Sequence, residues 1–194
     1  MKSPPHRTPT TASFILAVLL LGRISSGGDL PPGKQAVFLV RVIAYDANLR
    51  SRAGPSVNIA VLAKKGDKES EQMSESILKA FSPLESATLL GLSVKVVRIY
   101  FAGREGLERA VREGGIDTFY VCRGLDANLT EIESVSRQRK VLTVASQEGH
   151  LKLGLSLGVF EVGGKNTILV NLDASREEGV AFGPELLRLA TVVR

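Results

Sequence analysis

The chain of 194 residues contains one cysteine, Cys122, no tryptophan and few aromatic side chains of any kind. A lone cysteine cannot close a disulfide within the chain, so the fold must be stabilised by its apolar core. Cys122 follows the apolar run 118–121, a setting typical of a buried core thiol; a reactive thiol and an intermolecular bridge are the alternatives. The scarcity of aromatics argues against the base stacking that single-strand nucleic-acid binders use.

Much of the formal net charge of +5 comes from the first 27 residues. Residues 1–27 hold three basic residues and no acid, which leaves 22 basic against 20 acidic residues in 28–194. These charges are interspersed and form no basic stripe of the kind that binds a phosphate backbone. We therefore predict no nucleic-acid partner.

Motifs for metal or nucleophilic chemistry are missing as well. The sequence has no HExxH, no CxxC and no cluster of Asp, Glu and His at ligand spacing. His150 is the only histidine after the first 27 residues and follows the loop-like stretch 147–149, where a solvated side chain is expected; a His-based triad is the alternative. Gly163-Gly164-Lys165 and the segment 103–106 are fragments of a phosphate loop without its full pattern. We predict no enzyme activity, no cofactor and no metal.

The first 27 residues have the composition of a signal peptide. A basic leader with Lys2 and Arg7 precedes the short apolar core 14–21, and the small residues Ser25 and Gly27 suit a signal peptidase. The apolar run 12–22 is far below the roughly 20 residues of a membrane-spanning helix, which disfavours the alternative of an uncleaved anchor. The prediction is export to the periplasm, cleavage before Gly28 and one domain over residues 28–194.

After this leader, apolar runs of strand length alternate with segments of helical spacing. Expected strands cover 57–63, 94–100, 116–122 and 141–145, and expected helices cover 34–49, 67–81, 104–113 and 128–135. Asn128 and Glu131 resemble a capping box, which explains Asn128 better than the glycosylation sequon that it also starts. This alternation predicts an α/β fold with a mostly parallel central sheet flanked by helices.

The pattern changes after His150. Alternating apolar residues in 153–162 and 168–172 flank the turn 163–166 and predict a C-terminal β-hairpin. Asp173 is placed to cap a short helix that starts at Ala174 and ends at Gly179, a role favoured over catalysis. Pro184 opens a final helix that reaches Ala190.

Ligand sites in open α/β sheets lie outside the carboxyl ends of the parallel strands. In this chain those ends run into the loops 64–67, 102–104, 123–126 and 146–150, where helix N-termini favour an anion. A solvated loop surface is the alternative interpretation. The candidate ligand-binding residues on this rim are Lys64, Arg104, Arg123, Ser146, Glu148 and His150.

The order of segments in the second half resembles the YfiR family. The resemblance rests on Val141-Leu142-Thr143-Val144, Glu148-Gly149, the glycines Gly154 and Gly158, the run 168–172, Ala174 and the run 185–190, together with the opening segment 34–39. It implies a periplasmic α/β protein, commonly a homodimer, that binds the outward-facing part of an inner-membrane diguanylate cyclase or sensor and holds it inactive. The best-known members carry disulfide cysteines, which this chain lacks.

Two functions from different classes follow. The first is a periplasmic regulatory binding protein that represses a membrane-bound diguanylate cyclase through protein contact and so acts in cyclic-di-GMP signalling and biofilm control. The second is a single-lobe solute-binding component of a transporter or sensor, because the alternating pattern resembles one lobe of a periplasmic binding protein.

Overall fold

The computed structural model describes residues 30–84 and 88–193, and the predicted signal peptide, residues 1–27, lies outside this part. The strands are β1 (Ser56–Ala63), β2 (Thr88–Leu89), β3 (Leu92–Tyr100), β4 (Thr118–Val121), β5 (Leu142–Ala145), β6 (Leu157–Val162), β7 (Lys165–Asn171) and β8 (Ala190–Val193). The α-helices are α1 (Pro32–Ile43), α2 (Leu49–Ala53), α3 (Lys68–Phe81), α4 (Gly103–Gly114), α5 (Leu129–Arg139), α6 (Glu148–Lys152), α7 (Leu172–Glu177) and α8 (Pro184–Leu187). Two short 3₁₀ helices are η1 (Ser82–Leu84) and η2 (Asp126–Asn128).

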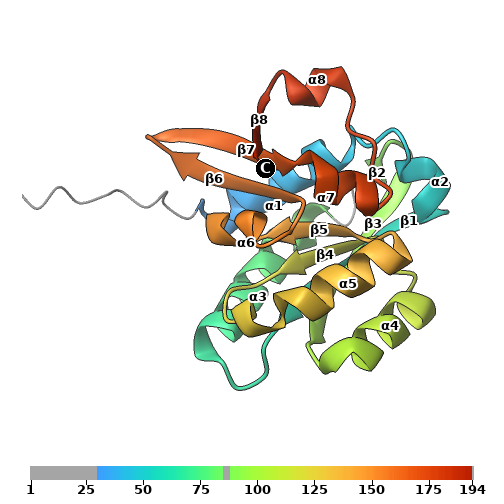
Figure 1. Cartoon of the computed structure of the whole chain (residues 1–194), viewed down its shortest axis with the longest axis vertical. Coiled ribbons are helices and arrows are strands. Elements are labelled where there is room, and N and C mark those ends of the chain that lie inside the picture. The colour runs from blue at the N-terminus through green and yellow to red at the C-terminus, as the bar shows by residue number, and fades with distance from the viewer. Residues whose placement is uncertain (1–29, 85–87, 194) are drawn as a thin grey trace, which may run out of the picture.

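All strands of the described part belong to one sheet in the order β2-β3-β1-β4-β5-β6-β7-β8 (Figure 1). The pairs β3–β1, β1–β4, β4–β5 and β5–β6 are parallel, while β2–β3 and β6–β7 are antiparallel. The sheet order turns back at β1, because β3 lies on one side of it and β4 on the other. The predicted α/β fold, with a mostly parallel sheet and a C-terminal hairpin, is confirmed.

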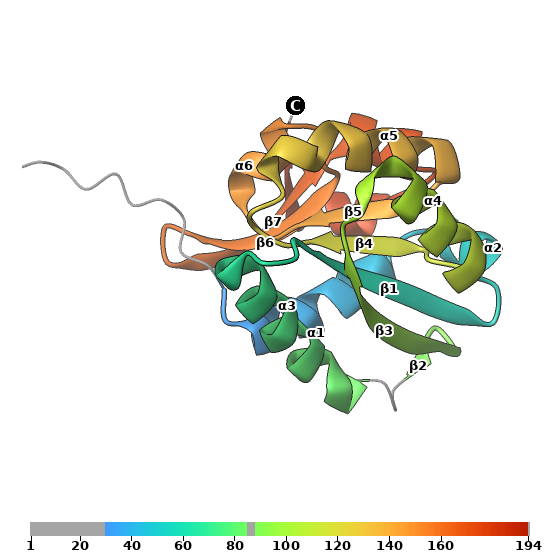
Figure 2. The ribbon, with the colours of Figure 1, turned by 90° about the horizontal axis from the view of Figure 1, so that it is seen from below.

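Helices cover both faces of the sheet, with α1 and α3 on one side and α4, α5 and α6 on the other (Figure 2). Successive side chains of β1 alternate between the two layers: Ile59 and Val61 pack in the α1–α3 core, and Ala60 and Leu62 in the α4–α5 core. Because both faces are covered, β1 is buried almost throughout, which explains its continuous apolar sequence.

The single helix predicted over 34–49 is wrong, because α1 ends at Ile43 and α2 begins at Leu49. Between them Asp46 forms an isolated antiparallel bridge with Phe182. The Asp46 carboxylate accepts hydrogen bonds from the backbone N–H groups of Asn48 (3.0 Å) and Ala181 (2.9 Å) and from the guanidinium of Arg52 (2.7 Å). A contact with residues far along the chain therefore interrupts a segment of helical spacing.

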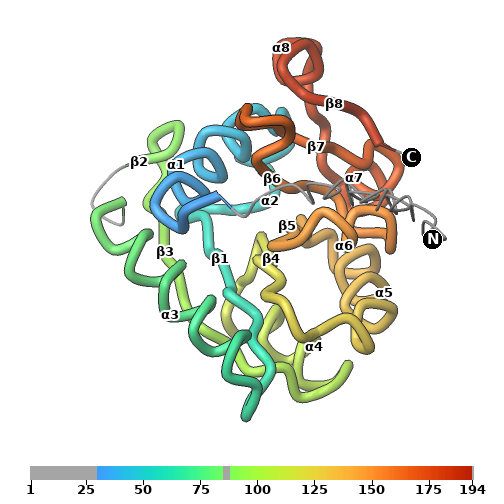
Figure 3. The backbone as a smooth tube through the Cα atoms, turned by 90° about the vertical axis from the view of Figure 1, so that its left-hand side faces the viewer, coloured from blue at the N-terminus to red at the C-terminus, as the bar shows by residue number. Residues whose placement is uncertain are grey.

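At the C-terminus the hairpin is confirmed, and its turn uses positive φ at Gly163 (58°) and Gly164 (76°), as a two-residue hairpin loop requires. The final helix predicted to Ala190 is wrong. It ends at Leu187, and residues 190–193 form β8, which pairs parallel to β7 (Figure 3). The open edge of β7 needs partners for its backbone groups, and this long-range pairing prevails over the helical spacing.

Two predicted helix caps are also wrong. Asn128 makes no side-chain cap to α5, and the Glu131 carboxylate instead accepts the backbone N–H of Arg104 at 3.0 Å. The cap of α7 is Asn171, whose side chain accepts from the N–H of Ala174 (3.1 Å), while Asp173 is exposed in the first turn. At α7 the neighbouring Asn171 has the better position for the cap bond, whereas at α5 the Glu131 carboxylate is taken by the start of α4.

Candidate functional site

The carboxyl ends of β1 and β4 mark the point where the sheet order turns back, and a pocket opens beside them. It has a volume of about 430 Å³ and lies between the start of α1, the first half of α3 and the loop after β4. We call it the α1–α3 pocket; it is lined by Leu30, Pro31, Pro32, Gln35, Glu69, Gln72, Met73, Ser76 and Arg123. This is the position where open α/β sheets bind ligands.

The inner wall of the pocket is held by a buried hydrogen-bonded pair. The amide oxygen of Gln35 accepts the hydroxyl of Tyr120 in β4, and its amide nitrogen donates to the carbonyl of Leu30 at 2.7 Å. Gln35 retains 6% of its exposure, so its polar atoms are satisfied by the protein. The start of α1 is therefore fixed to the centre of the sheet, which gives the pocket a rigid wall.

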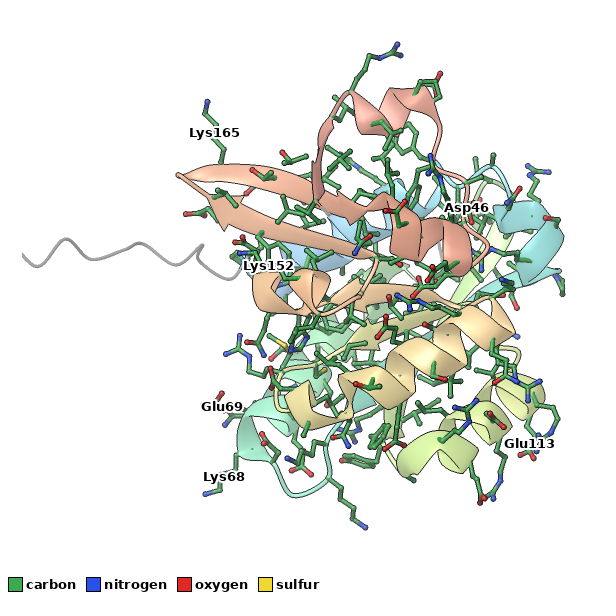
Figure 4. The ribbon with its side chains drawn as sticks, in the orientation of Figure 1. Asp46, Lys68, Glu69, Glu113, Lys152 and Lys165 are labelled. Carbon is green, nitrogen blue, oxygen red and sulfur yellow. The ribbon has the colours of Figure 1, made fainter. Side chains whose placement is uncertain are left out.

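The pocket combines two opposite charges with apolar walls. Arg123 is half-buried after β4, and Glu69 projects with Lys68 from the start of α3 (Figure 4). Pro32 and Met73 supply apolar surface between them. In the described part of the chain no group of three His, Cys, Asp or Glu side chains is arranged to hold a metal ion. The lining suits a small polar organic ligand.

The helix N-termini on this rim already bind the chain's own acidic groups. Asp67 caps α3 by accepting the N–H of Ser70 at 3.0 Å, and Glu71 accepts the N–H of Gly66 at 3.0 Å. Gly124 lies so close that a Cβ atom there would come within 2.8 Å of the Asp67 carboxylate. The loops after β1 and β4 are thus packed together, and an anion at the start of α3 would compete with Asp67.

The predicted ligand residues do not meet in one place. Arg123 lines the α1–α3 pocket, Lys64 is exposed after β1, and Glu148 is half-buried in α6. The Arg104 guanidinium donates to Glu108 (3.0 Å), Ser134 (2.9 Å) and Gln138 (2.6 Å), so it joins α4 to α5.

His150 is not the solvated loop residue that its sequence context predicts. It lies in α6 with 1% exposure, and its Nε2 is 3.1 Å from the Asp126 carboxylate. Burial by itself raises the pKa of Asp126, but the hydrogen bond with His150, hydrogen bonds from backbone N–H groups and the electrostatic effect of His150 together outweigh it, so the pKa lies below its ordinary value. The His150 Nδ1 and the buried Ser146 hydroxyl have no hydrogen-bond partner among the described residues. The pair ties the buried His150 of α6 to the exposed Asp126 of η2.

A buried carboxylate that sequence reasoning missed connects the C-terminal segment to the sheet. Glu178, just after α7, accepts hydrogen bonds from the Thr143 N–H (2.8 Å) and from the hydroxyls of Thr143 (2.7 Å), Ser136 (3.0 Å) and Ser156 (2.5 Å). Burial raises the pKa of Glu178 to about 7, although these hydrogen bonds lower it. An acidic residue before a glycine carries no sequence signal for such a role.

A second buried carboxylate, Asp117, lies at the opposite, amino end of the strands. Its Oδ2 accepts the backbone N–H of Asn58 in β1 at 2.8 Å. Burial raises the pKa of Asp117 to about 6, against the lowering effects of this hydrogen bond and of the Arg52 charge. Asp117 therefore connects β1 to the start of β4 and is remote from the α1–α3 pocket.

A sequence model of the YfiR/HmsC-like proteins matches residues 34–191, which is most of the chain. The chain belongs to the YfiR/HmsC-like family. Proteins of this family are periplasmic regulators and not catalysts. No curated protein matches the sequence significantly.

Solved structures share the fold of this YfiR/HmsC-like chain at low sequence identity. An ABC domain from Streptococcus pneumoniae in complex with L-Trp superposes with a TM-score of 0.57 at 14% identity, over 84% of this chain and 60% of that one. CD0873, a substrate binding protein with adhesive properties from Clostridium difficile, gives 0.55 at 14% identity, over 76% and 57%. A conserved domain protein from Vibrio cholerae gives 0.58 at 15% identity, over 86% and 61%. The chain spans about 60% of the length of these proteins, and the likeness shows the fold alone.

Two glycines in the part of the chain that resembles the YfiR/HmsC-like family occupy positions where a larger side chain would clash. Gly154 adopts a φ of 102°, and a Cβ there would meet the Glu133 carboxylate. At Gly158 a Cβ would overlap the ring of Phe160. Both positions require glycine so that α6 and β6 can pack closely against their neighbours.

Proposed function

We propose that this chain is a periplasmic regulator that represses a membrane-bound diguanylate cyclase through direct protein contact. The observation that carries the proposal is the YfiR/HmsC-like match over residues 34–191. The apolar core of residues 14–21, behind a basic leader, supports export. In the described part of the chain no helix is long and apolar enough to cross a bilayer. The partner in the inner membrane would then supply the enzymatic output.

Deletion of the gene tests this proposal through the cellular level of cyclic-di-GMP. The level should rise on deletion and return to normal when the full chain is restored. A matched chain without residues 2–27 should accumulate but fail to lower the level, because it would stay on the wrong side of the inner membrane.

Affinity capture from solubilised membranes supplies the second readout. The full chain should recover a protein that has a periplasmic segment and a cyclase domain. An unchanged cyclic-di-GMP level, together with capture of no such protein, contradicts the proposal. The homodimer that the resemblance implies stays a prediction, which sedimentation velocity on the purified chain measures.

A solute-binding component is the second candidate function, and the α1–α3 pocket favours it. The pocket lies at the turning point of the sheet order and offers Glu69, Arg123 and an apolar wall within about 430 Å³. The substrate binding protein from Clostridium difficile has the same fold. In this reading a small ligand binds one lobe, and a membrane transporter or sensor detects the complex.

Thermal unfolding in the presence of single amino acids and sugars tests the second candidate. A ligand that binds the native state alone stabilises it by RT ln(1 + L/Kd) at a free ligand concentration L, so the unfolding temperature rises with the logarithm of the ligand concentration above Kd. Gln72→Ala and Met73→Ala, both in the pocket, should abolish the shift. Lys68→Ala, exposed at the start of the same helix and outside the lining, should retain it. No shift with any ligand, or an equal shift in all three variants, contradicts a pocket site.

A further inference from the structure

The strand β3 lies near one side of the sheet, and most of its outer edge has no strand partner in residues 30–84 and 88–193. Among the described residues only Thr88 and Leu89 pair with this edge, opposite Ser93 and Leu92. Figure 2 shows β3 running well past the short β2. A long strand edge of this kind presents backbone N–H and C=O groups that another strand can bind.

Beside this edge, β3 and α4 enclose an apolar cleft of about 320 Å³. Val97 and Ile99 of β3 form one wall, Ala110 and Gly114 of α4 form the other, and Ile116 lies below them. Val97 is 46% exposed, which is high for a valine on a sheet face otherwise covered by helices. The cleft exists because α4 packs mainly on α5 and leaves the face of β3 partly open. Its volume accommodates one large aliphatic or aromatic side chain.

The exposed charges of this strand are all positive. Lys95 lines the cleft and forms no ion pair in the part of the chain that the structure describes. Arg98 projects from the opposite face and lies over the ring of Tyr100, 5.3 Å from the ring centroid. No acidic residue occurs between Leu92 and Phe101. The edge is therefore complementary to a negatively charged strand.

We propose that the β3–α4 cleft binds an extended acidic segment of a partner protein, which adds a strand to the outer edge of β3 and inserts one large apolar side chain between β3 and α4. Backbone hydrogen bonds supply affinity in this mode, and the side-chain pocket supplies selectivity. The site goes beyond the proposed repressor function and rests on it only for the identity of the protein that carries the segment.

A second copy of this chain fits the edge poorly. Antiparallel pairing of two β3 edges would bring four positive charges, Lys95 and Arg98 of each copy, into one short interface. Like charges on neighbouring strands are destabilising, and lysine on an edge strand is a common device against self-pairing. The same two cations attract an acidic segment. They also oppose pairing between copies of the chain, so the unpaired edge does not lead to aggregation.

Binding of a synthetic peptide to the full chain tests the proposal. The probe is a fluorescent seven-residue peptide, Asp-Asp-Val-Leu-Val-Asp-Asp, which places aspartates on both faces of the added strand around the central Leu, followed by anisotropy at low salt. Three matched peptides separate the contributions: one with the central Leu replaced by Ala, one with Lys in place of each Asp, and one N-methylated at alternate backbone amides. Each control peptide should bind at least about tenfold more weakly than the acidic probe. Added salt should weaken the binding of the acidic probe.

Variants of the protein locate the site. Lys95→Glu with Arg98→Glu should reduce affinity at least about tenfold, and Lys165→Glu should leave it unchanged. Figure 4 shows Lys165 at the tip of the β6–β7 hairpin, on the opposite side of the molecule from Glu113 at the end of α4. Ala110→Leu should fill the cleft and abolish binding of the Leu peptide, whereas Ala110→Ser, of similar volume, should retain it.

Equal binding of the acidic and N-methylated peptides overturns the proposal, as does binding that survives Ala110→Leu. A chain that binds no peptide but forms a dimer broken by Val97→Asp assigns the edge to a second copy and also overturns it. These outcomes are separate from the proposed function, because repression of a cyclase can persist in a Lys95→Glu, Arg98→Glu variant that binds no peptide.

Discussion

The carboxylate of Glu178 accepts the backbone N–H of Thr143 at 2.8 Å, although the two residues are 35 positions apart. Thr143 lies in the middle of β5, and Glu178 lies just after α7. The same carboxylate also binds hydroxyls from α5 and from the residue before β6. One buried side chain therefore holds the C-terminal segment against the parallel sheet.

Glu178→Ala should destabilise the fold by about 2 to 3 kcal/mol at pH 5.5, because it leaves the Thr143 N–H and the Thr143 and Ser156 hydroxyls buried without their acceptor. Urea unfolding followed by circular dichroism measures the loss. The neighbouring Glu177→Ala is the control, since Glu177 is exposed and pairs with the partly exposed Arg137. Its midpoint should match that of the wild type, and an equal loss in both variants contradicts the role of Glu178.

The stability of the chain should fall as the pH rises from about 4.5 to about 7. The pKa of Glu178 is raised from 4.5 to about 7 by burial, so in this window the unfolded state has released a proton that the folded state retains. The free energy of unfolding then decreases with pH by roughly 3 kcal/mol and levels off above pH 7. Asp117, with its pKa raised to about 6, adds a decrease of the same sign between about pH 4 and 6.

Two neutral variants separate these contributions in urea titrations at several pH values. Glu178→Gln should remove the part of the decrease between pH 6 and 7, and Asp117→Asn should remove part of the decrease below pH 6. A pH dependence that is unaltered in Glu178→Gln contradicts the assignment.

Asp46→Ala should destabilise the fold by about 3 to 5 kcal/mol, because it leaves Arg52 nearly buried without its charge partner. It also removes the acceptor of the Ala181 N–H, which connects the α1–α2 turn to the C-terminal segment. Asp173→Ala, at an exposed pair with Arg176, should leave the urea midpoint unchanged. The double variant Asp46→Ala, Arg52→Ala should lose less than the sum of the single variants.

Cys122 should react with a disulfide reagent only when the chain unfolds. It is fully buried, and burial raises the pKa of its thiol to about 12, so almost no thiolate forms at pH 8. Absorbance of the released thiol reagent should rise slowly in the native protein and within seconds in 6 M urea, to one equivalent. The chain has no other cysteine, so the yield needs no correction. Fast labelling of the native protein contradicts the buried position.

The alternation of apolar runs and helical spacing was sufficient to predict the parallel sheet, the hairpin and the burial of Cys122. These features depend on the local period of the apolar residues, which the order of residues along the chain encodes directly. The predicted rim of ligand residues carried less information. The predicted ligand residues Arg104 and His150 are not available for a ligand, because each is bound by a residue on another helix or loop.

The sequence by itself determined that the chain is α/β, because the side-chain period decides which segments are strands and which are helices. Only the tertiary structure decided that Asp46 interrupts the first helix, that residues 190–193 become a strand and that Glu178 enters the core. Each of these depends on a polar or backbone partner more than 15 positions away, and a buried polar group must take the partner that packing brings to it. The open edge of β3 is likewise a property of the sheet order, which no local pattern contains.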